Sequence, residues 1–254
     1  LGMTYILILF LTYVLHLLLK LNWVCTAVVL VFLLVTQHFH RIKGQRFQEA
    51  RKRFLDVSLY IDTLLYSFLK EQKIIRAFED VKSTLADGHM KETVSRAIDH
   101  MMLTFDETEV FVDAMRIIED EYKCNRIVNA HEFMAHAEYY GGDIKESARI
   151  LLKDKSAWER RILRNIEDRQ RMFHQIILSV VTSVIISGII LYLPVLSMDI
   201  SSNIIVQILS AALIVLDDLI ILWGQKFLEV DYLGIDLLPE DDKHAKKLDE
   251  YKAY

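Results

Sequence analysis

The sequence contains few of the residues that make turns and cross-links. Among its 254 residues are only two prolines, eight glycines and two cysteines. So little turn chemistry argues against a fold of many short strands and favours long helices, so the class predicted is all-α. Cys25 lies in an apolar run and Cys124 in a charged segment, and neither has another cysteine at metal-ligand spacing. We interpret them as two small buried thiols.

Several functional motifs are also missing. No glycine-rich loop is followed by Lys and Ser or Thr, so the chain does not supply ATP chemistry itself. No serine has the strand-to-helix context of a hydrolase nucleophile. The net charge is −5 and charges of both signs alternate through the middle of the chain, which offers no sustained basic face to nucleic acid. We therefore expect no enzyme, no cofactor and no nucleic-acid partner.

The sequence is rich in hydrophobic residues, which make up 53% of the chain. Four apolar runs cover residues 3–19, 23–36, 175–195 and 204–223. The first two runs are separated by three residues, so they predict a helical hairpin, and the last two predict a second hairpin that crosses a membrane and returns. Each arm of the first hairpin is short, and an interfacial position of the first run is the alternative.

Charged residues beside these runs predict the orientation. Lys and Arg are dense after the second run and before the third, whereas residues 196–203 contain neither. The positive-inside rule therefore predicts a multi-pass protein of the cytoplasmic (inner) membrane with both termini in the cytoplasm, and only Lys20 opposes this. We expect the basic flanks to contact anionic lipid headgroups as well. The membrane-flanking basic residues are Arg41, Lys43, Arg46, Arg51, Lys52, Arg53, Arg160, Arg161 and Arg164.

Four parts follow from this layout. They are an N-terminal transmembrane hairpin (1–40), a cytoplasmic helical domain (41–173), a C-terminal transmembrane hairpin (174–224) and a cytoplasmic tail (225–254).

The cytoplasmic domain is predicted to be a bundle of about six helices. It contains no proline, and its glycines, at 44, 88 and 141–142, mark expected helix ends. With no breaker before Pro194, we expect the last helix to continue into the third apolar run. The predicted helices are 45–69, 72–86, 90–103, 107–123, 126–140 and one from 143 onward.

Apolar residues at spacings of three and four indicate which helix faces pack. We expect the methionines among them to fill the core. One such face contains Leu55, Leu59, Asp62, Tyr66 and Leu69, a second contains Val110, Ala114, Ile117 and Ile118, and the methionines are Met101, Met102, Met115 and Met134.

The segment NAHEFMAHAEYYGGD, residues 129–143, resembles a zinc-protease helix because His131 is followed by Glu132. His136, however, lies five residues after His131, which puts the two imidazoles roughly 140° apart on a helix. We therefore interpret both as ordinary helical histidines. The end of the segment is predicted to be a structural corner, at which Gly141 and Gly142 stop one helix and Asp143 caps the next.

Gly88 is expected to mark a similar corner. On this interpretation Gly141→Val should destabilise the bundle more than His131→Ala does.

Asp217 and Asp218 are unusual because they are adjacent carboxylates inside an apolar run. An ion at that depth costs several kcal/mol unless it is paired, protonated or hydrated. Intramembrane aspartyl proteolysis needs converging carboxylates, whereas neighbours on a helix point about 100° apart. Two interpretations stay open, namely pairing with the basic flank near the cytoplasmic end and an intramembrane contact between helices or subunits.

Several segments occur in an order that resembles a known family. AEYYGGDIKESARILLKDKSAWERR, residues 137–161, has a helix ending in a glycine pair, then a small apolar and acidic run, then a basic stretch leading to the membrane. With QKIIRAFEDV and LADGHMKETVSRAI upstream, it is similar to the F-domain inner-membrane platform proteins of type II secretion systems and type IV pili. The resemblance covers about residues 45–195.

Two features refine the resemblance. KEQK at 70–73 replaces the family's usual Gly-x-Ser-like turn, and its common prolines are absent. Because 254 residues hold one such domain, the chain is most similar to the single-domain members of the tight-adherence (Tad/Flp-type) pilus machinery.

The resemblance implies a platform without enzymatic activity. Family members couple a separate hexameric cytoplasmic ATPase to insertion or extraction of pilin subunits, and act with a second, related platform protein or as an oligomer. The expected partners are thus that ATPase, a related platform protein or further copies of the chain, prepilin or pilin subunits, and membrane lipid. A membrane-embedded metallo- or aspartyl protease using His131, Glu132 and His136, or Asp217 and Asp218, is one alternative. An unrelated membrane scaffold or receptor is the other.

Overall fold

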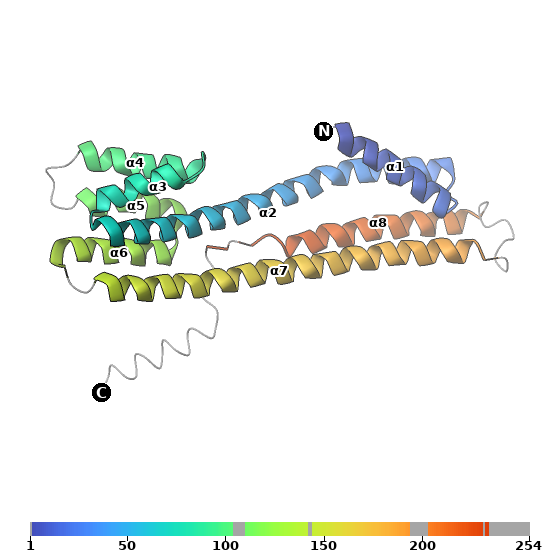
Figure 1. Ribbon diagram of the computed structural model, residues 1–254. Coiled ribbons are helices and arrows are strands. Elements are labelled where there is room, and N and C mark those ends of the chain that lie inside the picture. Colours follow the sequence, from blue (N-terminus) through green and yellow to red (C-terminus); the bar gives the residue numbers. More distant parts are fainter. Residues whose placement is uncertain (1, 104–109, 142–143, 194–202, 231, 234–254) are drawn as a thin grey trace. The chain divides into compact units, whose positions relative to one another are not determined.

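The computed structural model describes residues 2–103, 110–141, 144–193, 203–230 and 232–233. The prediction of an all-α fold is confirmed, because all the regular structure in these residues is helical (Figure 1). The helices are α1 (Gly2–Leu18), α2 (Trp23–Glu71), α3 (Ile74–Thr84), α4 (His89–Leu103), α5 (Val110–Tyr122), α6 (Asn125–Tyr140), α7 (Ile144–Leu191) and α8 (Ile204–Lys226).

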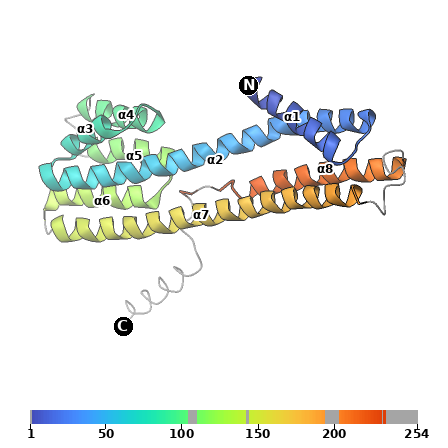
Figure 2. The ribbon, with the colours of Figure 1, turned by 45° about the vertical axis from the view of Figure 1, so that its right-hand side comes forward.

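The chain divides into two compact units. The apolar unit comprises Leu1–Gln48 and Asn165–Val230, and the bundle unit comprises Glu49–Arg164 and Asp231–Tyr254. In the described residues, the bundle unit holds all of α3, α4, α5 and α6 with the C-terminal part of α2 and the N-terminal part of α7 (Figure 2). Both α2 and α7 therefore contribute residues to each unit.

Helix α2 corrects one prediction. The sequence predicts separate helices over 23–36 and 45–69 with a break at Gly44, but α2 runs without interruption for 49 residues. Nothing lies within 4 Å of the position that a Cβ on Gly44 would take. A glycine in a helix interior costs only about 1 kcal/mol relative to alanine, which the long apolar and amphipathic stretches on either side outweigh.

Among the residues that the structure describes, three helices, α2, α7 and α8, are long and apolar enough to cross a membrane. Helix α1 is apolar but has only 17 residues, which at 1.5 Å per residue spans about 25 Å against the ~30 Å of a hydrocarbon core. The structure therefore does not match the prediction of four spans in full. Large apolar side chains on these helices face outward, as on Ile6, Leu178 and Leu209, which are 64–68% exposed and present an apolar surface suited to lipid.

Polar contacts join the helices of the apolar unit at the end where α1 turns into α2. The Gln207 side chain on α8 accepts from the Asn22 N–H (2.7 Å) and donates to the Lys20 carbonyl (2.8 Å). Lys20 Nζ lies 4.2 Å from the Tyr192 ring centroid, and the Tyr192 hydroxyl donates to the Leu17 carbonyl. Lys20, which opposes the predicted orientation, is thus held by specific contacts.

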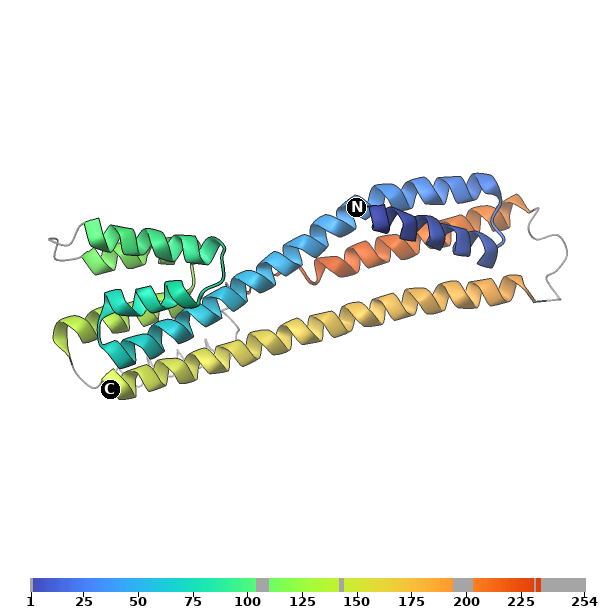
Figure 3. The same cartoon turned by 45° about the horizontal axis from the view of Figure 1, so that its top comes forward.

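Close packing also joins α1 to α7. A Cβ added at Gly188 would lie 2.6 Å from Leu18 Cγ, so only glycine lets these two helices approach so closely. Small residues at such crossings are typical of helices packed in membranes. Helix α8 contacts α7 in the same way, because a Cβ on Gly224 would lie 3.0 Å from Ile176 Cδ1. Figure 3 shows α8 beside the start of α2 as well.

The core of the bundle unit is built on a different face of α2 from the predicted one. Leu55, Leu59 and Tyr66 are 41–61% exposed, which corrects the prediction. The buried face is offset by about one position and is apolar apart from the hydroxyls of Ser58 and Tyr60. It contains Phe54, Val57, Tyr60, Ile61, Leu64, Leu65 and Phe68.

Other packing predictions fare better. Val110, Ala114 and Ile118 on α5 are buried as predicted. Met101, Met115 and Met134 are buried in the core, whereas Met102 is 55% exposed and does not fill it.

Helix ends in the bundle unit arise in two ways. Gly141 follows α6 with φ +69° and ψ −152°, a conformation almost restricted to glycine, so α6 ends where the glycine pair predicts. Gly88 precedes α4, and its carbonyl accepts the Glu92 N–H at 3.1 Å. After α2 and α5, however, Gln72 (φ +51°) and Lys123 (φ +47°) adopt the left-handed conformation without being glycine.

Candidate functional site

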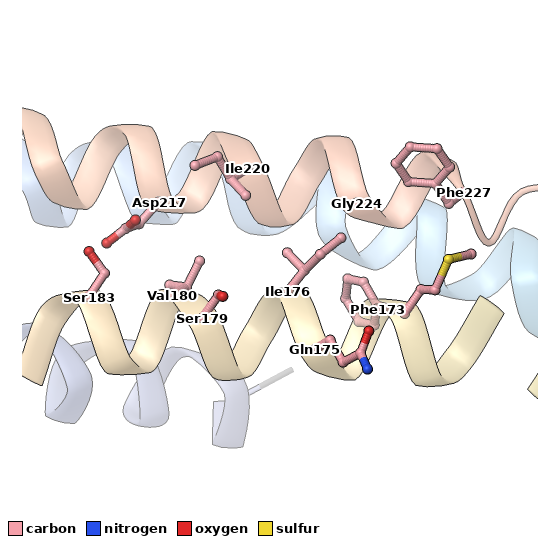
Figure 4. Close-up of a pocket in the computed structure, with 11 residues that line it drawn as sticks. Phe173, Gln175, Ile176, Ser179, Val180, Ser183, Asp217, Ile220, Gly224 and Phe227 are labelled. Carbon is pink, nitrogen blue, oxygen red and sulfur yellow. The ribbon is translucent and has the colours of Figure 1, made fainter. Parts of the chain in front are cut away.

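The most distinctive feature of the apolar unit is a hollow between α7 and α8 with a volume of about 570 Å³. On α7, Gln175, Ser179 and Ser183 follow one another at intervals of four and form a polar stripe along it. Figure 4 shows Asp217 on α8 directed toward Ser183. The remaining lining is largely apolar and consists of Met172, Phe173, Ile176, Val180, Ile220, Gly224 and Phe227.

Asp217 is buried, being only 8% exposed, yet its carboxylate is not fully partnered. Its Oδ2 atom is shielded from solvent and has no hydrogen-bond partner in the described structure. Because unpaired polar groups in an apolar setting cost several kcal/mol, an orphaned carboxylate oxygen is a marked exception, and Oδ2 of the adjacent Asp218 is a second one.

Asp218, the adjacent residue, has a different environment. Its Oδ1 atom lies 3.1 Å from Nε2 of His40 on α2, and the other ring nitrogen of His40 lies 3.1 Å from Gln225 Oε1. Lys43, one turn further along α2, donates to the Leu222 carbonyl at 2.7 Å. The two carboxylates therefore point to different neighbours and do not form the converging pair that aspartyl proteolysis requires.

The other predicted basic residues do not form one site. In the bundle unit, three arginines line a shallow hollow of about 380 Å³ together with Asp154 and Ala157. The three are Arg160, Arg161 and Arg164.

On α2 the remaining basic side chains are exposed and have separate neighbours. Arg46 lies 4.0 Å from Glu229. Arg53 donates to the Glu121 carbonyl and lies over the Tyr122 ring. Lys52 Nζ lies near Gly88. The two other basic residues of this stretch, Arg41 and Arg51, have exposed side chains.

The zinc-protease resemblance is not supported by the geometry of its residues. His131 is buried on α6 at 1% exposure, whereas Glu132 and His136 are exposed, so the two histidines occupy different faces as predicted. Both ring nitrogens of His131 are engaged, Nδ1 with Glu119 Oε1 (2.7 Å) and Nε2 with the Tyr60 hydroxyl (2.6 Å). In the part of the chain that the structure describes, no group of three His, Cys, Asp or Glu residues could hold a metal ion.

The hydrogen bonds of His131 indicate its tautomer. A carboxylate only accepts, so Nδ1 donates to Glu119, and with the ring neutral Nε2 accepts from the Tyr60 hydroxyl. Burial lowers the pKa of His131, although the Glu119 carboxylate opposes this, and the ring is held neutral. Burial also raises the pKa of Tyr60 well above its usual range, with a further contribution from Glu119. His131 is therefore a structural group of the core rather than a metal ligand.

A second buried polar group in the bundle unit is also fully partnered. Lys155 on α7 is 2% exposed, and its ammonium donates to Asp62 on α2 and to Glu159 Oε2 at 2.8 Å. Burial raises the pKa of Glu159, but its hydrogen bonds with Lys155 and Ser58 outweigh this and leave the pKa below its usual value.

The predicted structural corner is described only in part. Gly141 has the positive φ expected of it, and Gly88 precedes α4, while Gly142 and Asp143 lie outside the described residues. The predicted tail over 225–254 lies outside them beyond residue 233.

Sequence reasoning missed the polar stripe of α7. The i, i+4 recurrence of Gln175, Ser179 and Ser183 inside an apolar run is visible in the sequence and could have identified it. The pairing of His40 with Asp218 joins residues 178 positions apart, so no local pattern indicates it.

Comparison of the whole chain with known protein families, with curated proteins and with solved structures finds no match.

Proposed function

We propose that this chain is an inner-membrane platform protein of a type IV (Tad/Flp-like) pilus or a type II secretion machine. The observation that best supports the proposal is helix α7, which continues for 48 residues from the bundle unit into the apolar unit. The ordered motifs of residues 137–161 add the resemblance to platform proteins.

The proposed topology has four membrane spans and both termini in the cytoplasm. Helices α2, α7 and α8 have the length and composition to cross. Helix α1 is shorter, but the contact of Lys20 with Tyr192 and the close approach of Leu18 to Gly188 hold it against α7, which has the length and composition to cross. Local thinning of the bilayer or a small mismatch accommodates its length at modest cost. In this topology the bundle unit lies in the cytoplasm.

The proposed role is mechanical. A separate hexameric ATPase acts on the bundle unit, and the continuous helices α2 and α7 transmit the displacement to the spans that contact pilin subunits. A helix without a break can do this because no segment has to melt during the motion. A related platform protein or a second copy of the chain completes the assembly.

The test is co-purification of the tagged full chain from its native membranes. We expect it to carry an assembly ATPase, and genes for that ATPase and for prepilin-like small proteins to lie beside its own gene. A helix-breaking double variant, Glu167→Pro with Asp168→Gly in α7, should retain the ATPase but abolish pilus assembly or secretion.

Two results would contradict the proposal. If neither an ATPase nor prepilins are found, the chain is an unrelated scaffold or receptor. If the double variant assembles pili normally, α7 does not act as a lever.

A further inference from the structure

We propose that the hollow between α7 and α8 is a docking site for a transmembrane helix of a different polypeptide that presents a basic or hydrogen-bond-donating group to Asp217. The inference deepens the proposed function by assigning one surface of the platform to an intramembrane partner. It does not depend on the ATPase, which would act on the bundle unit.

Charge is the first argument. The described residues that line the hollow include one carboxylate and no Lys, Arg or His. The basic groups that α2 brings to α8 have other partners, since His40 contacts Asp218 and Gln225 and Lys43 donates to the Leu222 carbonyl. The uncompensated oxygen of Asp217 therefore calls for a donor from outside the chain.

The shape of the polar lining is the second argument. The nine residues from Gln175 to Ser183, which are eight helical steps, span about 12 Å of helix, and Gln175 and Ser179 are exposed. A stripe of amide and hydroxyl groups along one helix face suits another helix laid beside it, because polar side chains hydrogen-bond across packed helices in membranes.

A lipid acyl chain is the competing occupant, and it suits the site less well. It would fill the volume but offer no hydrogen-bond donor to Asp217 Oδ2. In hydrocarbon an unpartnered carboxylate oxygen is costly, whereas a helix with one basic side chain facing Asp217 supplies the missing donor directly.

The experiment uses the full chain reconstituted in dioleoylphosphatidylcholine vesicles. The probes are two fluorescent Leu/Ala peptides of about 20 residues, long enough to span, which differ only in a central Lys or Leu. Energy transfer from labelled chain to peptide measures binding. We expect the Lys peptide to bind about 3- to 20-fold more tightly than the Leu peptide, the range of one interhelical polar contact.

The matched variants are Asp217→Asn and Asp218→Asn. Asp217→Asn should remove the preference for the Lys peptide, whereas Asp218→Asn should keep it, because Asp218 does not line the hollow. Circular dichroism checks that both variants remain folded.

Equal binding of the two peptides to the unmodified chain, or retention of the preference by Asp217→Asn, would overturn the proposal. Self-association of the chain that Asp217→Asn abolishes would assign the site to a second copy, and would overturn it as well. None of these results bears on ATPase binding, so this inference and the proposed function fail separately.

Discussion

The buried ionisable groups of the two units differ in how completely their atoms are partnered, although the buried Trp158 Nε1 of the bundle unit also has no hydrogen-bond partner among the described residues. In the bundle unit, both ring nitrogens of His131 are engaged and Lys155 donates to two carboxylates. In the apolar unit, Asp217 Oδ2 has no hydrogen-bond partner in the described structure, while Asp218 has one oxygen bonded to His40 and its own Oδ2 unpartnered. Closed networks stabilise and specify a fold, whereas an open polar group in an apolar setting marks a place where another molecule can bind.

The largest loss of stability is expected from removing the two negative charges that partner the Lys155 ammonium. The double variant Asp62→Asn with Glu159→Gln keeps the side-chain shapes but leaves a buried ammonium without a counter-charge. We expect a loss of about 3–5 kcal/mol, measured as the opening free energy of α2 amides by hydrogen exchange in the full chain.

The matched control for that variant is Asp113→Asn with Glu79→Gln. It removes two exposed ion pairs, with Arg116 and with Arg76, from the same unit. Its expected cost is at most about 1 kcal/mol. Equal losses of opening free energy in the two double variants would mean that Asp62 and Glu159 do not stabilise a buried Lys155 ammonium.

The second prediction concerns His131 and Gly141, for which the contacts of His131 lead us to expect the opposite order to the one expected from the sequence. His131→Ala leaves a cavity and removes the partner of the buried Tyr60 hydroxyl and of the partly exposed Glu119, so we expect it to cost about 2–4 kcal/mol. Gly141→Val forces an unfavourable backbone conformation for about 1–3 kcal/mol. Hydrogen exchange of α6 amides measures both, with the exposed His136→Ala as a control within about 0.5 kcal/mol. A milder effect of His131→Ala than of Gly141→Val would restore the original order.

The apolar unit provides the third prediction, at the crossing of α1 and α7. Gly188→Ala should lower the unfolding temperature of the full chain in detergent, because its Cβ overlaps Leu18. The expected cost is about 1–3 kcal/mol. The double variant Leu18→Ala with Gly188→Ala should recover most of the loss. Failure of that recovery would show that α1 does not pack on α7 in this way.

The smallest effect is a pH dependence from His131. Its pKa is lower in the folded state than the ordinary value of 6.5, so the unfolded chain binds the proton more readily. This contribution to stability is complete above about pH 6.5 and decreases as the pH falls below it, by at most about 1.4 kcal/mol per unit. Hydrogen exchange of α6 at pH 7.5 and 5.5 should show a smaller change in His131→Gln than in the unmodified chain. An equal change in both would assign the pH dependence to other groups.

Most of the helical pattern was predictable from the sequence. Breaks near Gly88 and Gly141 follow from scarce glycines, and the long α7 follows from the absence of any breaker before Pro194. The break at Gly44 was wrong because one glycine cannot stop a helix that both flanks favour. Conversely, Gln72 adopts a left-handed conformation that glycine usually takes. A helix end at this position could not be predicted from the residue type.

The packed face of α2 was harder to predict because two stripes share the same spacing. The predicted stripe includes Asp62 and Tyr66, whereas the buried one, from Phe54 to Phe68, is almost wholly apolar. That difference in composition was available in the sequence. His131 gave a similar signal, since it lies on the same helix face as the small and apolar residues Ile127, Ala130 and Met134.

The site itself was predictable only as a pair of unusual residues. Adjacent carboxylates in an apolar run indicate that something must accommodate them. Asp218 is paired because His40, far away in the sequence, lies beside it, whereas Asp217 lines the hollow between α7 and α8. Long-range packing of this kind is not encoded in any local spacing.

The difference between Asp217 and Asp218 can be measured directly in membranes. Dicyclohexylcarbodiimide partitions into the bilayer and modifies carboxyl groups in apolar surroundings, and mass spectrometry of the full chain locates the adduct. We predict that Asp217 is modified, that Asp218 is protected by His40, and that His40→Ala exposes Asp218 to the reagent. Equal modification of both residues in the unmodified chain, or modification of Asp218 alone, would contradict the assignment of Asp217 as the open group of the apolar unit.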